Sequence, residues 1–314
     1  MIPPVRPIEL SDIEAARERI KGTVLRTPLV KFDDGIFLKL ENLQPTNAYK
    51  IRGGANAVAG LSDADRAKGV WTISAGNAGQ GVAYAARQFG IPCTVVAIET
   101  APQTKLDRMR ALGATIVPVS YDRAWVAAET HEFPGLDGTF IHPFDNHEFI
   151  AGHGTMGLEI VEDCPDVRTV ICAIGGGGLI TGVGSAIKAQ CPDARVLGAE
   201  PETAAPYALS LDRREPSKFP DWQASFVDGA GGQSVTTRMW QRMQPVVDGA
   251  ITVTLDQTRD AMRLIAEKSR TIAEGAGALA LAAALTGQAG EGPIVCVVSG
   301  GNIDLGKFAD LVTG

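Results

Sequence analysis

The sequence has few of the residues that mark metalloproteins and disulfide-rich secreted proteins. Its 314 residues include only five cysteines and four histidines. The cysteines show no C-x-x-C spacing, and neither an H-E-x-x-H motif nor a zinc-type pairing of cysteine and histidine occurs, so we expect no metal site. Cysteines that are odd in number and mostly lie within or beside apolar runs are typical of reduced thiols. We therefore expect a cytoplasmic protein.

Two further shortages restrict the expected partners. The 29 basic residues form no run and are outnumbered by 36 acidic residues, for a net charge of −7. Nucleic acid is therefore not an expected partner, because binding phosphates requires clustered Lys and Arg. No stretch approaches about 18 uncharged apolar residues, so no membrane span is expected. Residues 1–20 are rich first in proline and then in charge, which does not resemble a signal peptide.

The chain instead shows a regular alternation of strand-like and helix-like segments. Short runs rich in β-branched residues are each followed by a segment of helical period; the runs are 70–74, 92–98, 114–119, 169–174, 195–200 and 293–298. This alternation favours an α/β fold in which open, mostly parallel, twisted sheets are covered by helices on both faces. Residues 139–145 read as a crossover, and residues 201–250 as largely irregular.

The two series of alternating segments predict two domains. The smaller domain comprises residues 69–146. The larger domain combines residues 1–68 with residues 147–314, so that the chain enters it, leaves it and returns. A pattern alone places such boundaries only to within a few residues.

Three predicted strands end in turns rich in glycine, where ligands bind in open α/β sheets. These turns are SAGNAGQG (74–81), GGGG (175–178) and SGGN (299–302). In the second turn, four residues without Cβ let successive backbone N–H groups point into one concavity, and the following helix adds positive potential. This arrangement predicts a phosphate site.

Three kinds of ligand that contain phosphate are candidates for this site. A nucleoside triphosphate is excluded because no Lys-Ser or Lys-Thr follows the glycines. A dinucleotide remains an alternative, since Glu200 ends the next strand about 20 residues on, although no G-x-G-x-x-G pattern is completed. The third is a cofactor with one phosphate and a reactive aldehyde, which requires a lysine. Lys50 lies in ENLQPTNAYKIRGG, just before Gly53 and Gly54, and such a lysine can form a Schiff base to pyridoxal phosphate.

At these motifs the chain resembles the fold-type II pyridoxal-phosphate enzymes, in particular the threonine and serine dehydratases and the serine racemases. PTNAYKIRGGANAV resembles their Schiff-base motif, SAGNAGQGVAYAAR their substrate-carboxylate loop, and GGGGLITGVGSAIK their phosphate loop. EGAGALALAAAL and VVSGGNID match two C-terminal motifs. The order and spacing agree from about residue 8 to residue 312, which implies two α/β domains of the tryptophan synthase β type.

The resemblance implies a role for each matching residue. Lys50 would hold pyridoxal 5'-phosphate as a Schiff base and, once released by substrate, act as the base on Cα. Tyr49 would lie beside the cofactor, Asn77 would bind its ring oxygen, and Ser299 would face its pyridine nitrogen. The phosphate would be bound by Gly175, Gly176, Gly177, Gly178 and Leu179. The substrate carboxylate would be bound by the loop of Ser74, Ala75, Gly76, Asn77 and Ala78.

Several positions depart from the family pattern. Asn47 replaces the glycine of the usual T-G-S-F-K motif, where it either contacts the substrate or serves as a turn residue. Ala78 replaces the usual histidine of the carboxylate loop. Ala75 stands where the racemases carry a serine that protonates Cα, and alanine cannot transfer a proton. Glu200 matches an acidic ligand of the racemases' divalent-cation site, but Pro206 replaces another, so no metal is expected there.

The expected function is that of a pyridoxal-phosphate-dependent dehydratase, or ammonia-lyase. It would perform α,β-elimination on a 3-hydroxy amino acid such as L-threonine or L-serine, giving a 2-oxo acid and ammonia. A dehydratase for a bulkier substrate such as phenylserine is one alternative, and a serine racemase or β-replacement relative is another. The expected partner is a small amino-acid substrate, and the resemblance suggests a homodimer.

Overall fold

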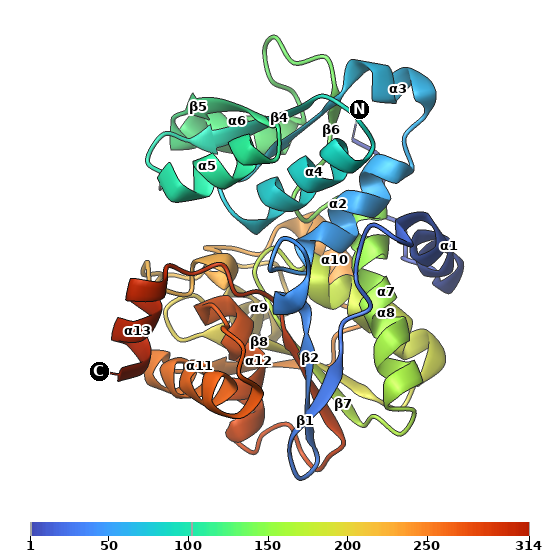
Figure 1. The fold of residues 1–314 in the computed structure, drawn as a ribbon. Coiled ribbons are helices and arrows are strands. Elements are labelled where there is room, and N and C mark those ends of the chain that lie inside the picture. Colours follow the sequence, from blue (N-terminus) through green and yellow to red (C-terminus); the bar gives the residue numbers. More distant parts are fainter. Residues whose placement is uncertain (1, 102, 314) are drawn as a thin grey trace.

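The computed structural model of the chain describes residues 2–101 and 103–313, which form two sheets (Figure 1). The six-stranded sheet has the order β1-β2-β10-β7-β8-β9. Its strands are β1 (Leu29–Asp33), β2 (Ile36–Leu40), β7 (Thr169–Ala173), β8 (Arg195–Pro201), β9 (Gly249–Val253) and β10 (Ile294–Val298). The four-stranded sheet has the order β5-β4-β3-β6. Its strands are β3 (Val70–Ile73), β4 (Cys93–Ile98), β5 (Thr115–Val119) and β6 (Thr139–Phe140).

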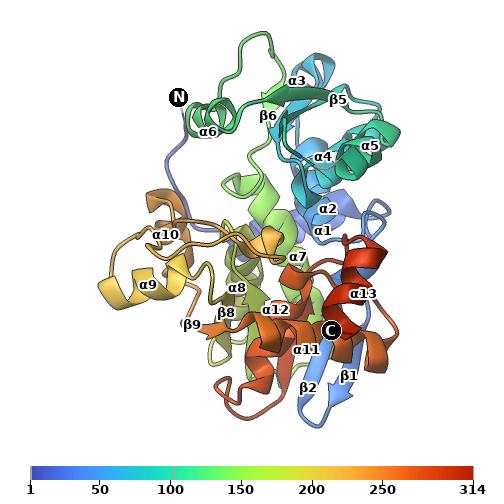
Figure 2. The ribbon, with the colours of Figure 1, turned by 90° about the vertical axis from the view of Figure 1, so that its left-hand side faces the viewer.

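The fold class predicted from the sequence is confirmed. Every described strand pair is parallel except β1–β2, which forms an antiparallel hairpin at the edge of the large sheet. The small sheet uses strands between residues 70 and 140, and the large sheet uses strands from both flanks of that segment. Figures 1 and 2 show the small sheet with its helices at one end of the molecule and the large sheet at the other. The domain limits at residues 69 and 146 stay a prediction.

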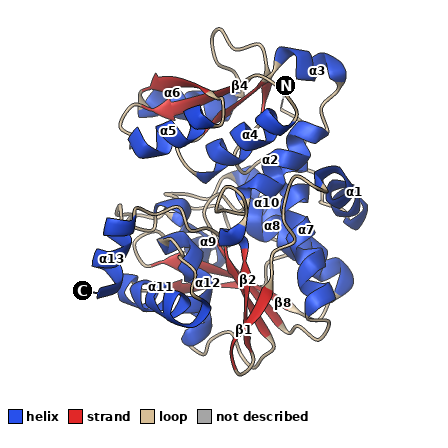
Figure 3. Cartoon of the chain, in the orientation of Figure 1, coloured by secondary structure: helices blue, strands red, loops and turns tan. Residues whose placement is uncertain are grey.

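Helices cover both faces of each sheet (Figure 3). Those of the large sheet are α1 (Leu10–Ile20), α7 (His147–Asp163), α8 (Gly178–Gln190), α9 (Pro206–Arg213), α10 (Thr237–Met243), α11 (Leu255–Ser269), α12 (Gly275–Leu285) and α13 (Leu305–Thr313). Those between β2 and β6 are α2 (Lys50–Ala59), α3 (Asp63–Lys68), α4 (Asn77–Gln88), α5 (Gln103–Ala111) and α6 (Tyr121–Thr130). Within the described ranges, no helix has the length and apolar character needed to cross a membrane.

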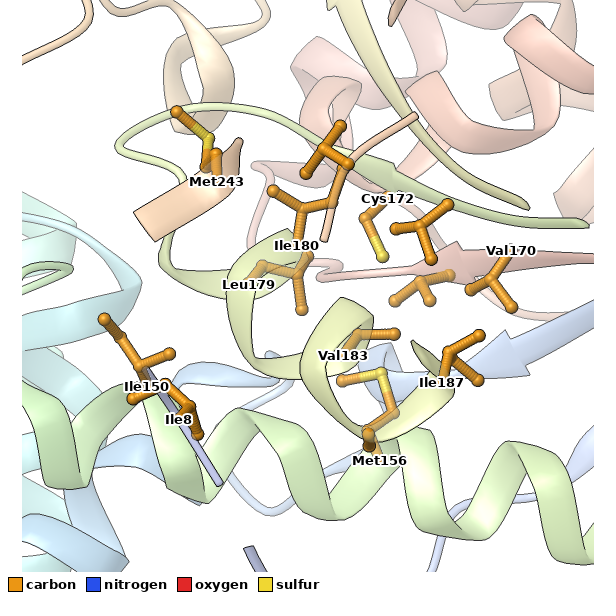
Figure 4. Close-up of a cluster of buried hydrophobic side chains, with 14 of the residues drawn as sticks. Ile8, Ile150, Met156, Val170, Cys172, Leu179, Ile180, Val183, Ile187 and Met243 are labelled. Carbon is orange, nitrogen blue, oxygen red and sulfur yellow. The ribbon is translucent and has the colours of Figure 1, made fainter. Parts of the chain in front are cut away.

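Strand β7 shows how the large sheet is buried on both faces. Val170 and Cys172 point into a core formed with α1, α7, α8 and α10, whereas Ile171 and Ala173 point into a second core formed with α11 and α12. Figure 4 shows side chains of α8 in the first core, including Val183, next to Val170 and Cys172. Uniformly apolar strands are typical of parallel sheets covered on both sides. The same rule applies in the small sheet, with α4 and α5 on one face and α6 on the other.

Two parts of the chain differ from the sequence-based expectation. Residues 201–250, expected to be irregular, contain α9 and α10. The buried Glu200 carboxylate accepts hydrogen bonds from the N–H groups of Tyr207 and Ala208, at 2.9 and 2.8 Å, and so caps α9, which has Pro206 in its first turn. Glu200 is also fully buried, so its carboxylate is not accessible to a ribose. The hairpin β1–β2 was not expected from the sequence, because Lys39 interrupts its apolar pattern.

Helix α2 packs closely against two neighbouring helices through its glycines. A Cβ on Gly54 would lie 2.6 Å from the Gly81 carbonyl oxygen of α4, and one on Gly53 would lie 2.7 Å from the Phe149 oxygen of α7. A Cβ on Gly81 would in turn lie 2.8 Å from the Lys50 carbonyl oxygen. Because real Cβ atoms do not approach so closely, these glycines set the position of α2 between α4 and α7.

Buried ion pairs fix the first turn of α2. The Arg52 guanidinium donates to both Glu41 oxygens at 2.8 Å and to the Glu159 oxygens at 2.7 and 2.9 Å. The Lys39 amine lies 2.7 Å from Glu159, and all four side chains are buried. The charges of these two positive and two negative groups thus balance in the interior. The ion pairs connect β2, α2 and α7.

Replacing Arg52 by alanine should destabilise the protein by about 3–5 kcal/mol, because Glu41 would keep a buried charge without its partner. The change is measured as the loss in free energy of unfolding in urea. Arg17→Ala is the matched control: its ion pair with Glu162 is exposed and should contribute about 1 kcal/mol or less. Equal losses for the two variants would contradict the assignment of the Arg52 pairs as a structural constraint.

Candidate active site

Lys50 is the first residue of α2 and lies at the junction of the two sheets. Its Nζ donates to the Pro143 carbonyl oxygen at 2.6 Å and lies 5.2 and 5.3 Å from the ring centroids of Tyr49 and Phe149. One side of the residue lines a cavity, but protein atoms surround the amine, and this desolvation lowers the pKa of Lys50 from its ordinary 10.5 to about 7. A substantial fraction of the amine is therefore uncharged near neutral pH and can act as a nucleophile or base.

The four glycines predicted to bind phosphate connect β7 to α8. Gly177 has a φ of +86°, and α8 begins at Gly178, so its first N–H groups have no acceptor within the helix. A Cβ on Gly176 would overlap the Phe144 ring, and one on Gly178 would lie 2.8 Å from the Phe144 carbonyl oxygen. A side chain at either position would therefore fill the cradle or displace Phe144. This loop fits a phosphate group bound by backbone N–H groups.

Two adjoining cavities bring the predicted site residues together. The larger has a volume of about 450 Å³, and the predicted residues that line it are Tyr49, Lys50, Ser74, Ala75, Gly76, Asn77, Ala78, Gly176 and Ser299. The smaller, of about 30 Å³, lies against the phosphate loop and is lined by Lys50, Ser299, Gly175, Gly176, Gly177, Gly178 and Leu179, among others. Asn47 is not in either set. It has a φ of +53° and accepts a hydrogen bond from the Gly301 N–H, which is the geometry of a turn residue.

A chain of polar side chains orients Asn77 at the start of α4. Its Nδ2 donates to Glu274 Oε1 at 2.7 Å, and its Oδ1 accepts from Asn302 Nδ2 at 2.8 Å. Burial, assisted by the nearby Asp228, raises the pKa of Glu274 to about 7. The sequence reasoning missed Glu274 and Asn302. In the sequence, Glu274 is a carboxylate directly before an alanine-rich helix, and Asn302 is an amide directly after Ser299-Gly300-Gly301; these positions could have indicated both residues.

The loop that carries Pro143 and Phe144 is held by charged groups behind it. Asp145 forms ion pairs with Arg238 and Arg242 of α10, at 2.5 and 2.9 Å. His142 Nδ1 accepts hydrogen bonds from the N–H groups of Phe144 and Asp145, and burial lowers the pKa of His142 to about 3, so the ring remains a neutral acceptor. These contacts fix both the acceptor for Lys50 and the ring against the phosphate loop.

The residues present fit pyridoxal phosphate better than a dinucleotide. An uncharged lysine can bind the aldehyde of this cofactor, and the glycine loop can bind its single phosphate. The Ser299 hydroxyl, which donates weakly to the Ala276 oxygen at 3.3 Å, lines both cavities and is available to a ring nitrogen. Glu200, which the dinucleotide alternative would require to bind a ribose, is the cap of α9.

Comparison with known proteins agrees with pyridoxal phosphate as the cofactor. The family model for pyridoxal-phosphate dependent enzymes matches residues 20–300. The L-threonine ammonia-lyase of Thermotoga maritima is 40% identical, over 97% of this chain and 78% of that protein. The structure of maize serine racemase superposes with a TM-score of 0.89 at 33% identity, covering 97% of each chain. Threonine deaminase isoform 2 from Solanum lycopersicum gives a TM-score of 0.85 at 29% identity, covering 100% of this chain and 96% of the other.

The chain belongs to the family of pyridoxal-phosphate dependent enzymes. The resemblance to the dehydratases and racemases seen in the sequence is thereby confirmed, as is the cofactor, pyridoxal phosphate. The role of each individual site residue stays a prediction.

The lowered pKa of Lys50 has a measurable consequence in the cofactor-free protein. Acylation by acetic anhydride requires an uncharged amine, so labelling of Lys50 should be half-maximal near pH 7. Lys31 serves as the internal control, because its hydrogen bond to Asp34 raises its pKa. Mass spectrometry of peptides after short pulses at a series of pH values would measure both residues. A Lys50 profile that rises only together with that of Lys31 would contradict the burial argument.

Proposed function

We propose that the protein is an ammonia-lyase that eliminates water from L-threonine or L-serine. The proposal is supported by the 40% identity to the L-threonine ammonia-lyase of Thermotoga maritima, which covers 97% of the chain. The observation that carries it is the Lys50 amine, which has a pKa near 7 and lies in a cavity between a phosphate-binding loop and the loop 74–78. That combination provides a base, a site for the cofactor and a site for an amino acid.

Each part of the site has a distinct task in this reaction. Bound pyridoxal phosphate makes the Cα proton of the amino acid acidic by withdrawing electrons. The amine of Lys50 removes that proton, and its pKa near the working pH suits it to accept and later return a proton. Gly175 to Gly178 and Leu179 would bind the phosphate with backbone N–H groups, an interaction that does not require a charged side chain.

The substrate carboxylate binds at the loop 74–78. Helix α4 begins at Asn77, so its first turn presents N–H groups and the positive end of its dipole to the cavity. Ser74 Oγ accepts a hydrogen bond from the Gly76 N–H at 3.1 Å, which fixes the bend of the loop. The hydrogen bonds from Asn77 to Glu274 and from Asn302 to Asn77 fix the start of α4 relative to the large sheet.

The overall reaction balances as an elimination followed by hydrolysis. The Cα–H and Cβ–OH bonds break, so that a proton and a hydroxide leave as water and a double bond forms between Cα and Cβ. The resulting enamine takes up one water and releases ammonia, which leaves a 2-oxo acid. Threonine would give 2-oxobutanoate and serine pyruvate, with no net consumption of water.

Racemisation is a second candidate, since maize serine racemase is a structural neighbour. It requires a proton donor on the face of Cα opposite Lys50. On the loop 74–78 that position corresponds, by resemblance, to Ala75, which lines the cavity and carries no exchangeable proton. Elimination is therefore favoured over racemisation.

We also propose a homodimer, by analogy with the dehydratases that the sequence resembles. A cytoplasmic location is proposed as well, because Cys172 and Cys296 are buried thiols whose pKa values burial raises, and such groups are kept as structural thiols under reducing conditions.

Lys50→Ala should lower ammonia release from threonine and serine by about 10³-fold or more, because both the cofactor attachment and the base are lost. Ammonia is measured in a coupled assay on purified protein, with circular dichroism to verify folding. Lys31→Ala is the matched control, since Lys31 is an exposed lysine paired with Asp34. A folded Lys50→Ala protein with normal turnover would refute the proposed role.

Chiral analysis of residual serine during turnover should show no appreciable interconversion of enantiomers. The reason is the missing proton donor at Ala75. Samples taken at several degrees of conversion would be separated on a chiral column and compared with ammonia release in the same mixture. Racemisation at a rate comparable to ammonia release would contradict the argument from Ala75 and show that the chain is a racemase as well as a lyase.

A further inference from the structure

A third and larger cavity, of about 890 Å³, adjoins the Lys50 cavity. The two share Ile98, Phe144, Gly176 and Asp228 as walls. The third cavity lies between α6 of the small sheet, α10 of the large sheet and the loop before α10. Figure 2 shows α6 and α10 on the same side of the molecule. A substrate that binds beside Lys50 therefore has a neighbouring space for its side chain.

The walls of this cavity are mainly aromatic and apolar. In addition to Phe144, they include Tyr121, Trp125, Trp222, Met239 and Met243. The rings of Tyr121 and Trp125 are stacked, with centroids 6.4 Å apart and planes at 13°. Although they line a cavity, Tyr121 and Trp125 remain 58% and 44% exposed. Covering these side chains with an apolar group would remove apolar surface from water and so stabilise the complex.

The indole nitrogens of both tryptophans are already paired, whereas Asp122, Lys218 and Gln233 add polar groups elsewhere in the lining. The indole nitrogen of Trp125 donates to Glu129 at 2.8 Å, and that of Trp222 donates to the Gly231 oxygen at 2.9 Å. Asp228, the acidic residue shared by the two cavities, forms an ion pair with Lys105 at 2.7 Å. Both tryptophans can therefore offer ring faces rather than hydrogen bonds to a ligand, which favours an aromatic or aliphatic occupant over a charged one.

We propose that this cavity binds the β-substituent of the substrate and that the enzyme accepts 3-hydroxy amino acids with a bulky aryl group, such as phenylserine. The inference rests on the proposed function, because it assigns the reacting atoms to the Lys50 cavity. The methyl group of threonine would leave the aromatic walls uncovered. A phenyl ring removed from water by these walls contributes about 30-fold to kcat/KM, if the contact is made in the transition state.

The kinetic test compares phenylserine and threonine on holoenzyme variants. Trp125→Ala and Trp222→Ala should each lower kcat/KM for phenylserine by about 10-fold and change that for threonine by less than about twofold. Trp125→Phe keeps an aromatic face and should restore most of the activity on phenylserine. Leu305→Ala, a large exposed apolar residue of α13, is the control and should change neither substrate.

A binding measurement tests the cavity without turnover. L-Phenylalanine and L-2-aminobutyrate both lack the 3-hydroxyl group and differ in the side chain. Calorimetric titration of the holoenzyme should show L-phenylalanine to bind at least about 10-fold more tightly, and Trp125→Ala should remove most of this difference. The preference and its loss do not depend on the chemical step.

Equal losses on both substrates, or no preference for L-phenylalanine in the titration, would overturn the proposal. A wild-type enzyme that converts threonine but binds L-phenylalanine no better than L-2-aminobutyrate would refute the side-chain site alone and leave the lyase assignment intact. An enzyme that releases ammonia from none of threonine, serine and phenylserine, yet prefers L-phenylalanine in the titration, would refute the lyase assignment and support the site.

Discussion

The position of Lys50 depends on the buried ion pairs of Arg52, two residues further along α2. Removing four charges from water costs several kcal/mol for each ion, and this cost is offset only when all partners are in place. Because Arg52 reaches both Glu41, directly after β2, and Glu159, on α7, the first turn of α2 has a single position relative to the large sheet. The Lys50 amine is therefore held in place by charged side chains that do not line the Lys50 cavity.

Helix α2 also determines where the loop 74–78 lies. The contacts of Gly54 with Gly81 and of Gly81 with the Lys50 carbonyl bring α4 to within van der Waals distance of α2. Helix α4 carries the loop 74–78 at its start, so this loop, which follows a strand of the small sheet, is positioned by a helix that is anchored in the large one. A side chain at Gly81 would separate the two halves of the site, which is why the glycines of the lysine motif and of the carboxylate loop are required together.

The parts of the fold that were predictable from sequence are those encoded locally. Apolar strands followed by glycine turns predicted the sheets and drew attention to the glycine loop 175–178, whereas Lys50 was predicted from its own motif; the roles of the loop and of Lys50 stay predictions. The hairpin β1–β2 was missed because the charge of Lys39 interrupts its apolar pattern, and its burial depends on partners that include the distant Glu159. Helix α9 was missed because its N-terminus is capped by the side chain of Glu200. Glu274 was missed because its role depends on Asn77, far away in the chain.

Phe144 lies between the cavity at which we propose the reaction and the cavity at which we propose side-chain binding. It lines all three cavities, and its loop is held by the ion pairs of Asp145 with Arg238 and Arg242. The wall on the side of the phosphate loop therefore cannot move without breaking buried ion pairs. In the described part of the opposite walls, the anchors of α6 and of the loop around Trp222 lie nearer the surface: the hydrogen bonds of Trp125 to Glu129 and of Trp222 to Gly231, and the ion pair of Asp228 with Lys105. Substitutions there can change which side chain fits while the lysine, the glycines and the carboxylate loop keep their positions, so substrate range can vary on a constant reaction.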